Sequence, residues 1–256
     1  MRAKKSFGQH FLIDDNLCSQ IATRASQYDN CDLILEIGPG KGALTKHLIS
    51  LELPLYAVEA DKDMVQHLNK IFPQWDNLLL MDFLKMPLDT LFEKKRIALV
   101  GNFPYNISSQ IVFKMLDYKE QIPVLIGMFQ REMARRIIAS PGSKEYGVIS
   151  VLTQLFYSGQ MLFKVPPEAF RPPPKVHSGV ILLERNNRTE LPCSYPLFKQ
   201  IVKNTFNQRR KMLRNTLKSI LPHPELLPAT LLTRRPEQLS VQEFLDLAAR
   251  IQDIIR

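Results

Sequence analysis

The sequence predicts an α/β fold with a mostly parallel, seven-stranded sheet and a small all-helical C-terminal domain. Two observations lead to this prediction. From residue 33 onward, short apolar runs typical of buried strands alternate with segments whose apolar residues recur at helical spacing. Beyond residue 187 only the helical spacing remains. We therefore expect a first domain over residues 1–187 and a second over residues 188–256.

The strands of the first domain are predicted from apolar runs that end at glycine or polar residues. Five runs alternate with helical segments, at 33–38, 55–60, 77–82, 97–102 and 124–129. These five strands are expected to be parallel, because a helix between two strands returns the chain to the same side of the sheet. Two further strands, at 161–165 and 177–185, complete the sheet. Sheets of this kind bind ligands outside the carboxyl ends of their strands.

The helices are predicted from apolar residues that recur at intervals of three and four. In the first domain they cover 42–51, 63–72, 109–118, 131–139 and 148–158. The period of the last of these also fits a strand. After a polar linker over 185–196, the helices of the second domain cover 197–221 and 240–255.

Composition and cysteine usage narrow the class of protein. Hydrophobic residues make up 45% of the chain, yet no uninterrupted apolar run is long enough to span a membrane, and the N-terminus lacks the apolar core of a signal peptide. Cys18, Cys31 and Cys193 have no metal-ligand spacing, so we expect no metal site and a reducing, cytoplasmic location. Nothing in the sequence gives a reason to expect an oligomer, so a monomer is predicted.

The net charge of +9 is concentrated at the two ends of the chain. Residues 1–11 carry +3, residues 12–185 are neutral, and residues 186–256 carry twelve basic and six acidic side chains. A neutral body with a basic arm and a basic tail is typical of a protein that contacts a polyanion at two places. The alternative is a soluble surface that is merely basic.

A glycine turn follows the first predicted strand, in the stretch EIGPGKG over residues 36–42. Gly38 and Gly40 allow a tight turn and a close approach by a ligand. Two features disfavour a pyrophosphate group: the Glu36 carboxylate would repel it, and Pro39 removes a backbone donor. A cationic ligand that resembles an amino acid fits the turn better.

Carboxylates follow the next two strands. Glu59 is suited to accept hydrogen bonds from both hydroxyls of a ribose, and Asp82 to accept from the amine of an adenine. The alternative for each is a helix N-cap. An amine, a sulfonium, a ribose and an adenine together describe S-adenosylmethionine, which we predict as the cofactor.

The stretch NFPYN closes the fourth strand at the same edge of the sheet. The side-chain oxygen of Asn102 and a carbonyl held by the Pro104 turn can accept from the two N–H groups of an adenine amine. Tyr105 offers a flat face on which the base stacks. Positioning of the amine then suffices for methyl transfer. The alternative is an ordinary turn with a core tyrosine.

Five stretches in this order resemble the ribosomal RNA adenine dimethyltransferases, in particular the bacterial members that act on the small subunit. They are EIGPGKGALT, VEAD, NFPYN, PPEAFRPPPKV and FNQRRKMLRNTL, and the resemblance extends from Phe7 to near Arg250. It implies a Rossmann-like class I methyltransferase that dimethylates N6 of two adjacent adenosines in the 3′-terminal hairpin of 16S rRNA. It also implies S-adenosylhomocysteine as the product and an immature 30S subunit as the substrate.

The resemblance also assigns roles to individual residues. It implies that His10 and Leu12 contact the methionine end of the cofactor, and that Phe170 forms a second aromatic wall against the target base. Without the resemblance, Phe170 is expected to be a core residue in a loop between two strands. Gly38 would lie under the methionine part and Asn102 would contact both cofactor and target. Phe103 stands where many members have leucine.

The basic residues near both ends are the predicted RNA contacts. In the predicted helix over 197–221, Arg210, Arg214 and Lys218 fall on one face. With their neighbours and the N-terminal arm, the predicted RNA-binding set is Lys4, Lys5, Arg209, Arg210, Lys211, Arg214 and Lys218. A solvated helix face is the alternative.

Two other functions remain open at this point. The large-subunit dimethyltransferases that confer macrolide resistance share the core motifs, so PPEAFRPPPKV and FNQRRKMLRNTL distinguish the two groups. Relatives of this fold also act as ribosome-assembly or nucleic-acid-binding factors in which methylation is secondary. Intact Glu59, Asp82 and Asn102 favour an active enzyme.

Overall fold

The chain forms two compact units in the computed structural model, which describes residues 9–255. The first unit runs to Ala134 and resumes over Gly159–Arg185. The second comprises Arg135–Ser158 and the chain from Asn186 onward. Residues 135–158, which the sequence assigned to the first domain, therefore group with the C-terminal helices.

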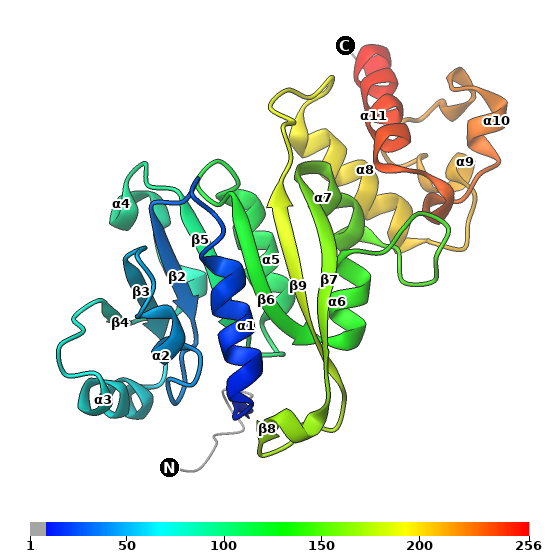
Figure 1. Cartoon of the computed structure of the whole chain (residues 1–256). Helices are drawn as coiled ribbons and strands as arrows, with labels where there is room; N and C mark the ends of the chain where they lie inside the picture. Colours follow the sequence, from blue (N-terminus) through cyan, green and yellow to red (C-terminus); the bar gives the residue numbers. More distant parts are fainter. Residues whose placement is uncertain (1–8, 256) are drawn as a thin grey trace. The chain divides into compact units, whose positions relative to one another are not determined.

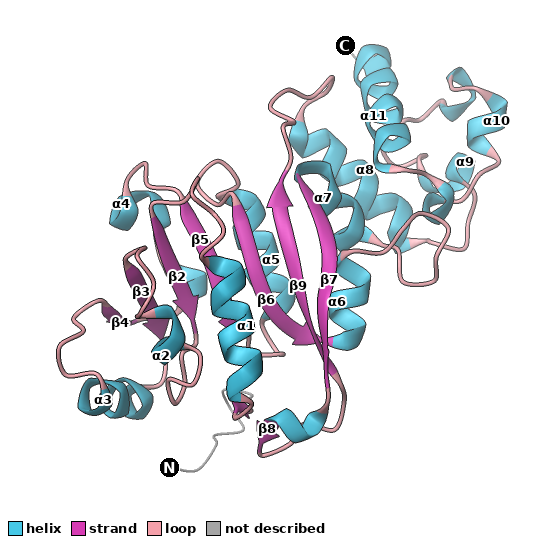
Figure 2. Cartoon of the chain, in the orientation of Figure 1, coloured by secondary structure: helices cyan, strands magenta, loops and turns pink. Residues whose placement is uncertain are grey.

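The regular elements follow the predicted alternation (Figures 1 and 2). From residue 9 to the end of β4 they are β1 (Phe11–Leu12), α1 (Asp15–Ala25), β2 (Leu33–Ile37), α2 (Thr45–Leu48), β3 (Leu55–Glu59), α3 (Lys62–Ile71) and β4 (Leu78–Leu80). Next come the 3-10 turn η2 (Phe83–Lys85), α4 (Leu88–Phe92), β5 (Ile97–Asn102), α5 (Ser108–Asp117), β6 (Val124–Gln130) and α6 (Arg131–Ile137). The remaining strands and their turn are β7 (Tyr157–Val165), η3 (Pro167–Ala169), β8 (Phe170–Arg171) and β9 (Ser178–Arg185).

The sheet of the first unit has seven strands in the order β4-β3-β2-β5-β6-β9-β7, which confirms the predicted fold class. The pairs β2–β3, β3–β4, β2–β5 and β5–β6 are parallel, and β9 is antiparallel to β6. The strand order reverses between β2 and β5, where Glu36 lies opposite Val100. The glycine turn and Asn102 therefore leave the sheet side by side, at the point where open α/β sheets bind ligands.

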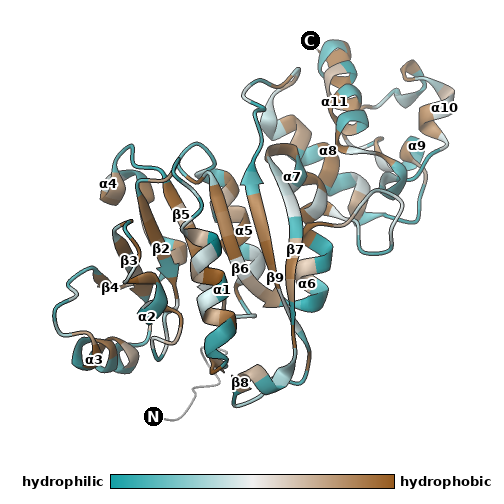
Figure 3. Cartoon of the chain, in the orientation of Figure 1, coloured by the Kyte–Doolittle hydropathy of each residue, from teal (hydrophilic) through white to brown (hydrophobic). Residues whose placement is uncertain are grey.

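Successive side chains of a strand point to opposite faces of the sheet, so even- and odd-numbered residues pack against different helices. Even-numbered strand residues such as Ile34, Val100 and Ile126 join the cluster that α1 contributes to through Cys18 and Ile21. Figure 1 shows α1 in front of the sheet and α5 behind it, and the central strands are hydrophobic in Figure 3. The central strands β2, β5, β6 and β9 are buried on both faces, which explains their nearly continuous apolar runs.

A small antiparallel ribbon brings the N-terminal segment to the carboxyl ends of the strands. In it β1 pairs with β8, with Phe11 opposite Arg171 and Leu12 opposite Phe170. The Ile13 amide extends the pairing by donating to the Ala169 carbonyl at 2.8 Å. Two-residue strands give no periodic signal, so the sequence did not predict this ribbon. It places residues 9–12 over the carboxyl ends of the strands.

The second unit is helical apart from the first residues of β7, and from 188 to 255 its regular elements are all helical, as predicted. They are α7 (Val148–Phe156), α8 (Tyr195–Asn207), α9 (Leu213–Thr216), η4 (Pro224–Leu226), α10 (Ala229–Leu232), η5 (Pro236–Gln238) and α11 (Val241–Ile255). Phe198 of α8 and Phe244 of α11 are fully buried in its core. No helix in the described part of the chain is long and apolar enough to cross a membrane.

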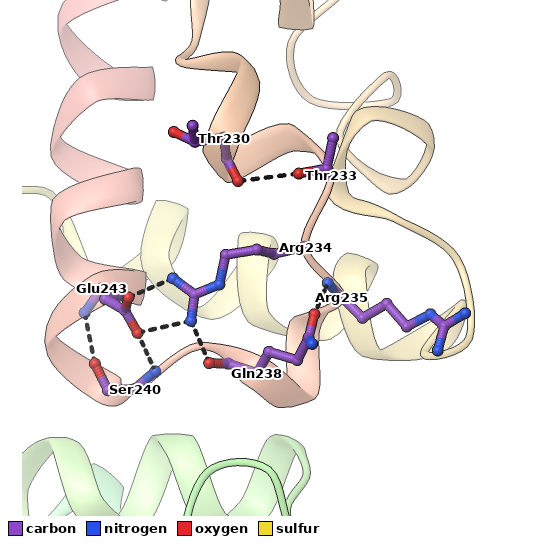
Figure 4. Close-up of polar contacts among 7 residues, drawn as sticks. All are labelled: Thr230, Thr233, Arg234, Arg235, Gln238, Ser240 and Glu243. Carbon is purple, nitrogen blue, oxygen red and sulfur yellow. Dashed lines mark hydrogen bonds and ion pairs between the residues drawn. The ribbon is translucent and has the colours of Figure 1, made fainter.

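The start of α11 is fixed by a polar cluster around Arg234 (Figure 4). Glu243 accepts from the Ser240 amide at 2.8 Å, and the Ser240 hydroxyl accepts from the Glu243 amide at 3.2 Å, which forms a capping box. The Arg234 guanidinium forms an ion pair with Glu243 and donates to the Gln238 carbonyl. The Arg234 side chain holds the pKa of Glu243 down to about 2, so this pair stays charged at neutral pH.

The predicted continuous helix over 197–221 is wrong. The helix α8 ends at Asn207, residues 208–211 form a turn, and only Leu213–Thr216 return to helix as α9. The Leu213 amide donates to the Arg234 carbonyl at 2.8 Å instead of to the carbonyl four residues earlier. Tertiary hydrogen bonds thus override the helical period, and Arg210, Arg214 and Lys218 do not share one helix face.

Candidate active site

A cavity of about 270 Å³ opens at the carboxyl ends of β2, β3 and β5 in the first unit. Its walls come from the segments 9–12, 36–41, 43–44, 58–60, 81–84 and 102–107. Every predicted cofactor residue lines it, namely His10, Leu12, Gly38, Gly40, Glu59, Asp82 and Asn102. Pro104 and Tyr105 line it as well, so one cavity joins the predicted cofactor and target groups.

The glycine turn forms the floor of the cavity. Gly38 and Gly40 have φ angles of +69° and +55°, which residues with a Cβ rarely adopt. A Cβ on Gly40 would also lie 3.2 Å from the Phe11 ring. The Gly38 amide donates to the Val58 carbonyl at 2.9 Å, which fixes the turn against β3. The turn therefore leaves its backbone close to whatever the cavity holds.

Glu59 is 7% exposed and accepts two backbone hydrogen bonds. Its Oε2 accepts from the Gly40 amide at 3.1 Å and its Oε1 from the Asp61 amide at 2.9 Å. Burial raises the pKa of Glu59, while these amides oppose the shift. The carboxylate thus joins the glycine turn to the end of β3 and keeps lone pairs available to hydroxyl donors in the cavity.

Glu36 is a second buried carboxyl group in the wall of the cavity, 1% exposed. The Thr45 hydroxyl of α2 donates to its Oε2 at 2.7 Å. Burial raises the pKa of Glu36 to about 8, and the nearby Glu59 charge acts in the same direction. A cationic ligand would relieve both effects, so the cavity is suited to a positively charged molecule.

We expect Glu36→Gln to remove a pH dependence from the stability of the free protein. Because the pKa of Glu36 rises from 4.5 to about 8 on folding, its stabilising contribution is complete below pH 4.5 and is lost as the pH rises to about 8. Each pKa unit corresponds to about 1.4 kcal/mol. The difference in melting temperature between Glu36→Gln and the wild type should therefore grow from pH 5 to pH 8.5. An equal difference in melting temperature at both pH values would contradict the raised pKa of Glu36 in the folded protein.

Asp82 follows β4 and lines the cavity, but it also caps a turn. Its Oδ1 accepts from the Leu84 amide at 2.9 Å, so it is the N-cap of η2. The cap and the ligand role are compatible, because a carboxylate can accept several hydrogen bonds through its two oxygens. The cap fixes the side chain at the rim of the cavity.

The amide of Asn102 has a defined orientation. Its Nδ2 donates to the His10 carbonyl at 2.9 Å, and because a carbonyl oxygen only accepts, the group facing it must be the NH₂. The Asn102 oxygen is therefore the atom left to accept from a ligand. This bond also fastens the N-terminal segment across the end of β5.

The Tyr105 ring forms part of an aromatic pair. The His10 ring stacks on it, with ring centroids 5.6 Å apart and an angle of 26° between the planes. The Tyr105 hydroxyl shares a hydrogen bond of 2.6 Å with Ser178, and burial raises the pKa of Tyr105, so the phenol stays protonated. The His10 Nδ1 donates to the Pro172 carbonyl at 2.9 Å, which identifies Nδ1 as the protonated ring nitrogen.

Phe103, in the middle of NFPY, points into the core. It is 1% exposed and its ring packs edge-on against Phe129 at 5.1 Å between centroids. Gly101 and Gly127 make room for it, since a Cβ on Gly127 would lie 2.2 Å from the Phe103 ring. Phe103 therefore anchors the loop from below and also contributes to the cavity wall, which Asn102, Pro104 and Tyr105 line as well.

We expect Gly127→Ala to lower the free energy of unfolding by about 3 kcal/mol, because a rigid ring occupies the space of the new methyl group. Adding Phe103→Leu should restore most of this loss. Gly179→Ala is the matched control in β9, because its methyl group would meet the flexible end of Met161 at 2.8 Å. Denaturant unfolding measures all three. If Gly127→Ala costs no more than Gly179→Ala, the proposed anchoring is wrong.

Phe170 does not line the cavity. It is 2% exposed and belongs to the core cluster that includes Leu12 and Val165. The core position was the alternative that the residues alone favoured. A role for Phe170 as a wall of the target pocket stays a prediction.

The predicted RNA-binding residues have different surroundings. Lys4 and Lys5 lie outside the described residues. The Arg209 guanidinium donates to the Lys144 carbonyl at 2.6 Å and to the Ser143 carbonyl at 2.9 Å, so it holds a loop of its own unit. The remaining four side chains are exposed: Arg210, Lys211, Arg214 and Lys218. Contact of these residues with RNA stays a prediction.

Several contacts of the site were not predicted, including the following three. Gln9 donates to the Asp61 carboxylate at 3.0 Å, Thr45 holds Glu36, and the Lys41 ammonium lies 4.7 Å from the centroid of the Phe11 ring. Each joins segments far apart in the sequence, or depends on a side-chain direction that periodicity does not give. Within residues 9–255, no group of three or more His, Cys, Asp or Glu side chains is arranged to hold a metal.

The profile of the family described as ribosomal RNA adenine dimethylase matches residues 1–253. The ribosomal RNA small subunit methyltransferase A of Phocaeicola vulgatus is 50% identical over all of this chain and 92% of its own length.

Two solved structures resemble the fold. A dimethyladenosine transferase from Plasmodium falciparum superposes with a TM-score of 0.77 at 24% identity, covering 93% of this chain and 96% of its own. The 23S rRNA methyltransferase ErmE superposes with a TM-score of 0.67 at 25% identity, covering 92% of this chain and 99% of its own. With the family profile matching almost the whole sequence, the chain belongs to the ribosomal RNA adenine dimethylase family, whose members are S-adenosylmethionine-dependent methyltransferases.

Proposed function

We propose that this protein transfers methyl groups from S-adenosylmethionine to N6 of two adjacent adenosines in the 3′-terminal hairpin of 16S rRNA, within an immature 30S subunit. The observation that carries the proposal is the single cavity that joins Glu59 and Asp82 to Asn102 and Tyr105. The relative from Phocaeicola vulgatus, with its small-subunit name, supports the choice of ribosomal RNA.

The residues present fit the cofactor. Two buried carboxyl groups, Glu36 and Glu59, favour a cationic ligand. Glu59 and Asp82 both line the cavity, and we propose that Glu59 accepts from the ribose hydroxyls and Asp82 from the adenine amine. The glycine turn and the His10–Leu12 segment would enclose the methionine end. When bound, the cofactor supplies a methyl group on positively charged sulfur, already activated for transfer, so we propose a metal-free reaction with S-adenosylhomocysteine as its product.

The side chains at the end of β5 then have to orient the target amine. The Asn102 oxygen accepts one N–H of the target amine. This hydrogen bond holds the nitrogen in line with the methyl group and favours a more tetrahedral nitrogen whose lone pair points at that group. A carbonyl of the Pro104 turn is proposed as the second acceptor. The Pro104 oxygen already receives the Ile107 amide at 3.2 Å, and a carbonyl oxygen retains a second lone pair. Tyr105 supplies a stacking face worth about 1–3 kcal/mol per base.

Labelled methyl transfer to undermodified subunits tests the proposal. Small and large subunits are offered separately, and the modified nucleotides are mapped by mass spectrometry. We expect label on two adjacent adenosines of the small-subunit RNA alone. Label on the large-subunit RNA would favour the macrolide-resistance type of activity, and binding to subunits without transfer would favour an assembly factor.

A further inference from the structure

Lys114 is a buried lysine on α5, the helix that begins directly after the NFPYN stretch. Its side chain is 9% exposed. Its Nζ donates to the Phe83 carbonyl at 2.6 Å and to the Met86 carbonyl at 2.5 Å. These two carbonyls lie at the beginning of η2 and directly after it, so a single ammonium group holds both ends of this turn.

The turn η2 belongs to the wall of the cofactor cavity. Asp82 caps it, and Asp82, Phe83 and Leu84 all line the cavity. Lys114 does not line this cavity; it lies on the other side of η2, in a separate hollow with Lys85, Met86 and Tyr118. Lys114 can therefore act on the cofactor cavity through the position of η2 and through its charge near Asp82.

Burying an ammonium group is costly unless its donors are satisfied. Burial lowers the pKa of Lys114, while the charges of Asp82, Asp89 and Asp117 oppose that shift. The Phe83 ring lies 5.0 Å from Nζ and adds a cation–π contact. Charge-assisted hydrogen bonds are shorter and stronger than neutral ones. These contacts make the placement of η2 depend on Lys114.

We propose that Lys114 is a positioning residue that sets where η2 carries Asp82, and thereby the preference of the cavity for an adenine amine. The inference rests on the proposed function, in which Asp82 accepts from that amine. It also couples the adenine side of the cavity to α5, and so to the loop that holds the target base.

The affinities of two ligands distinguish a positioning role of Lys114 from a general loss of protein stability. They are S-adenosylhomocysteine and its inosine analogue, which carries a carbonyl in place of the adenine amine. We expect the wild type to prefer the first by about tenfold or more, because the Asp82 carboxylate would face a carbonyl oxygen at position 6 of the analogue in place of the amine. Lys114→Met should lower this preference at least about fivefold. Lys85→Met is the matched control, because Lys85 is an exposed lysine on η2 itself, and it should keep the wild-type preference.

Calorimetry of the full chain gives both affinities for each variant. Equal weakening of both ligands by Lys114→Met would overturn the inference alone, since a purely structural role predicts that result. A wild type that binds both ligands equally would overturn the inference together with the assignment of Asp82. If Lys114→Met does not fold, Lys114→Arg is measured in the same way; a reduced preference supports the inference, and an unchanged one overturns it.

Discussion

Replacing Asn102 by alanine is expected to lower the rate of methyl transfer about 10²–10³-fold, the usual effect of removing one preorganised hydrogen-bonding group from an active site. The Asn102 oxygen is the group left to accept from the target amine, because its nitrogen is bound to the His10 carbonyl. Without it the amine loses the contact that aligns its lone pair. Single-turnover transfer to undermodified small subunits measures the effect.

Two further variants define what Asn102 contributes. Asn102→Asp keeps an acceptor but cannot donate to the His10 carbonyl, so it should also be impaired, through displacement of the N-terminal segment. Asn69→Ala removes an exposed amide on α3 and should transfer methyl at the wild-type rate. The affinity of Asn102→Ala for S-adenosylhomocysteine should change by less than about tenfold, since one hydrogen bond is lost. A wild-type transfer rate in Asn102→Ala would refute the assigned role.

Glu59→Gln is expected to weaken the binding of S-adenosylhomocysteine about 100-fold. The two Glu59 oxygens accept from the Gly40 and Asp61 amides, and a glutamine offers only one oxygen for both. One backbone N–H would then face an NH₂ group, and the ribose would lose a charged acceptor. Hydrogen bonds to charged groups contribute about 1.5–3 kcal/mol each.

Calorimetric titration compares Glu59→Gln with Glu52→Gln, a variant of an exposed glutamate in the turn before β3. Glu52→Gln should bind S-adenosylhomocysteine with the affinity of the wild type. A dissociation constant for Glu59→Gln within about twofold of the wild type would mean that the carboxylate has no part in holding the ribose.

Much of the first unit could be predicted because its signals are local. The apolar runs that became β2, β3, β5 and β6 are buried on both faces, and each ends in a glycine or polar residue at the ligand edge. Parallel pairing alone then places Gly38 beside Asn102. The cavity confirms that these predicted groups meet, although their individual roles stay proposals.

Other features depend on long-range contacts that no periodicity reports. The turn after α8 forms because Arg209 and Leu213 find partners in distant segments, so a regular helical pattern there was misleading. The β1–β8 ribbon is too short to leave a pattern, and it draws Phe170 into the core. Lys114 is indistinguishable from a surface lysine until the position of η2 is known.

The central claim is that one cavity holds the cofactor and the target adenine end to end at the switch between β2 and β5. A crystal structure of the protein with S-adenosylhomocysteine and the target RNA hairpin tests it most directly. We predict the adenine stacked on Tyr105, with its N6 within hydrogen-bonding distance of the Asn102 oxygen and the ribose of the cofactor on Glu59. An adenine seated away from Asn102, or a cofactor outside the glycine turn, would contradict the account.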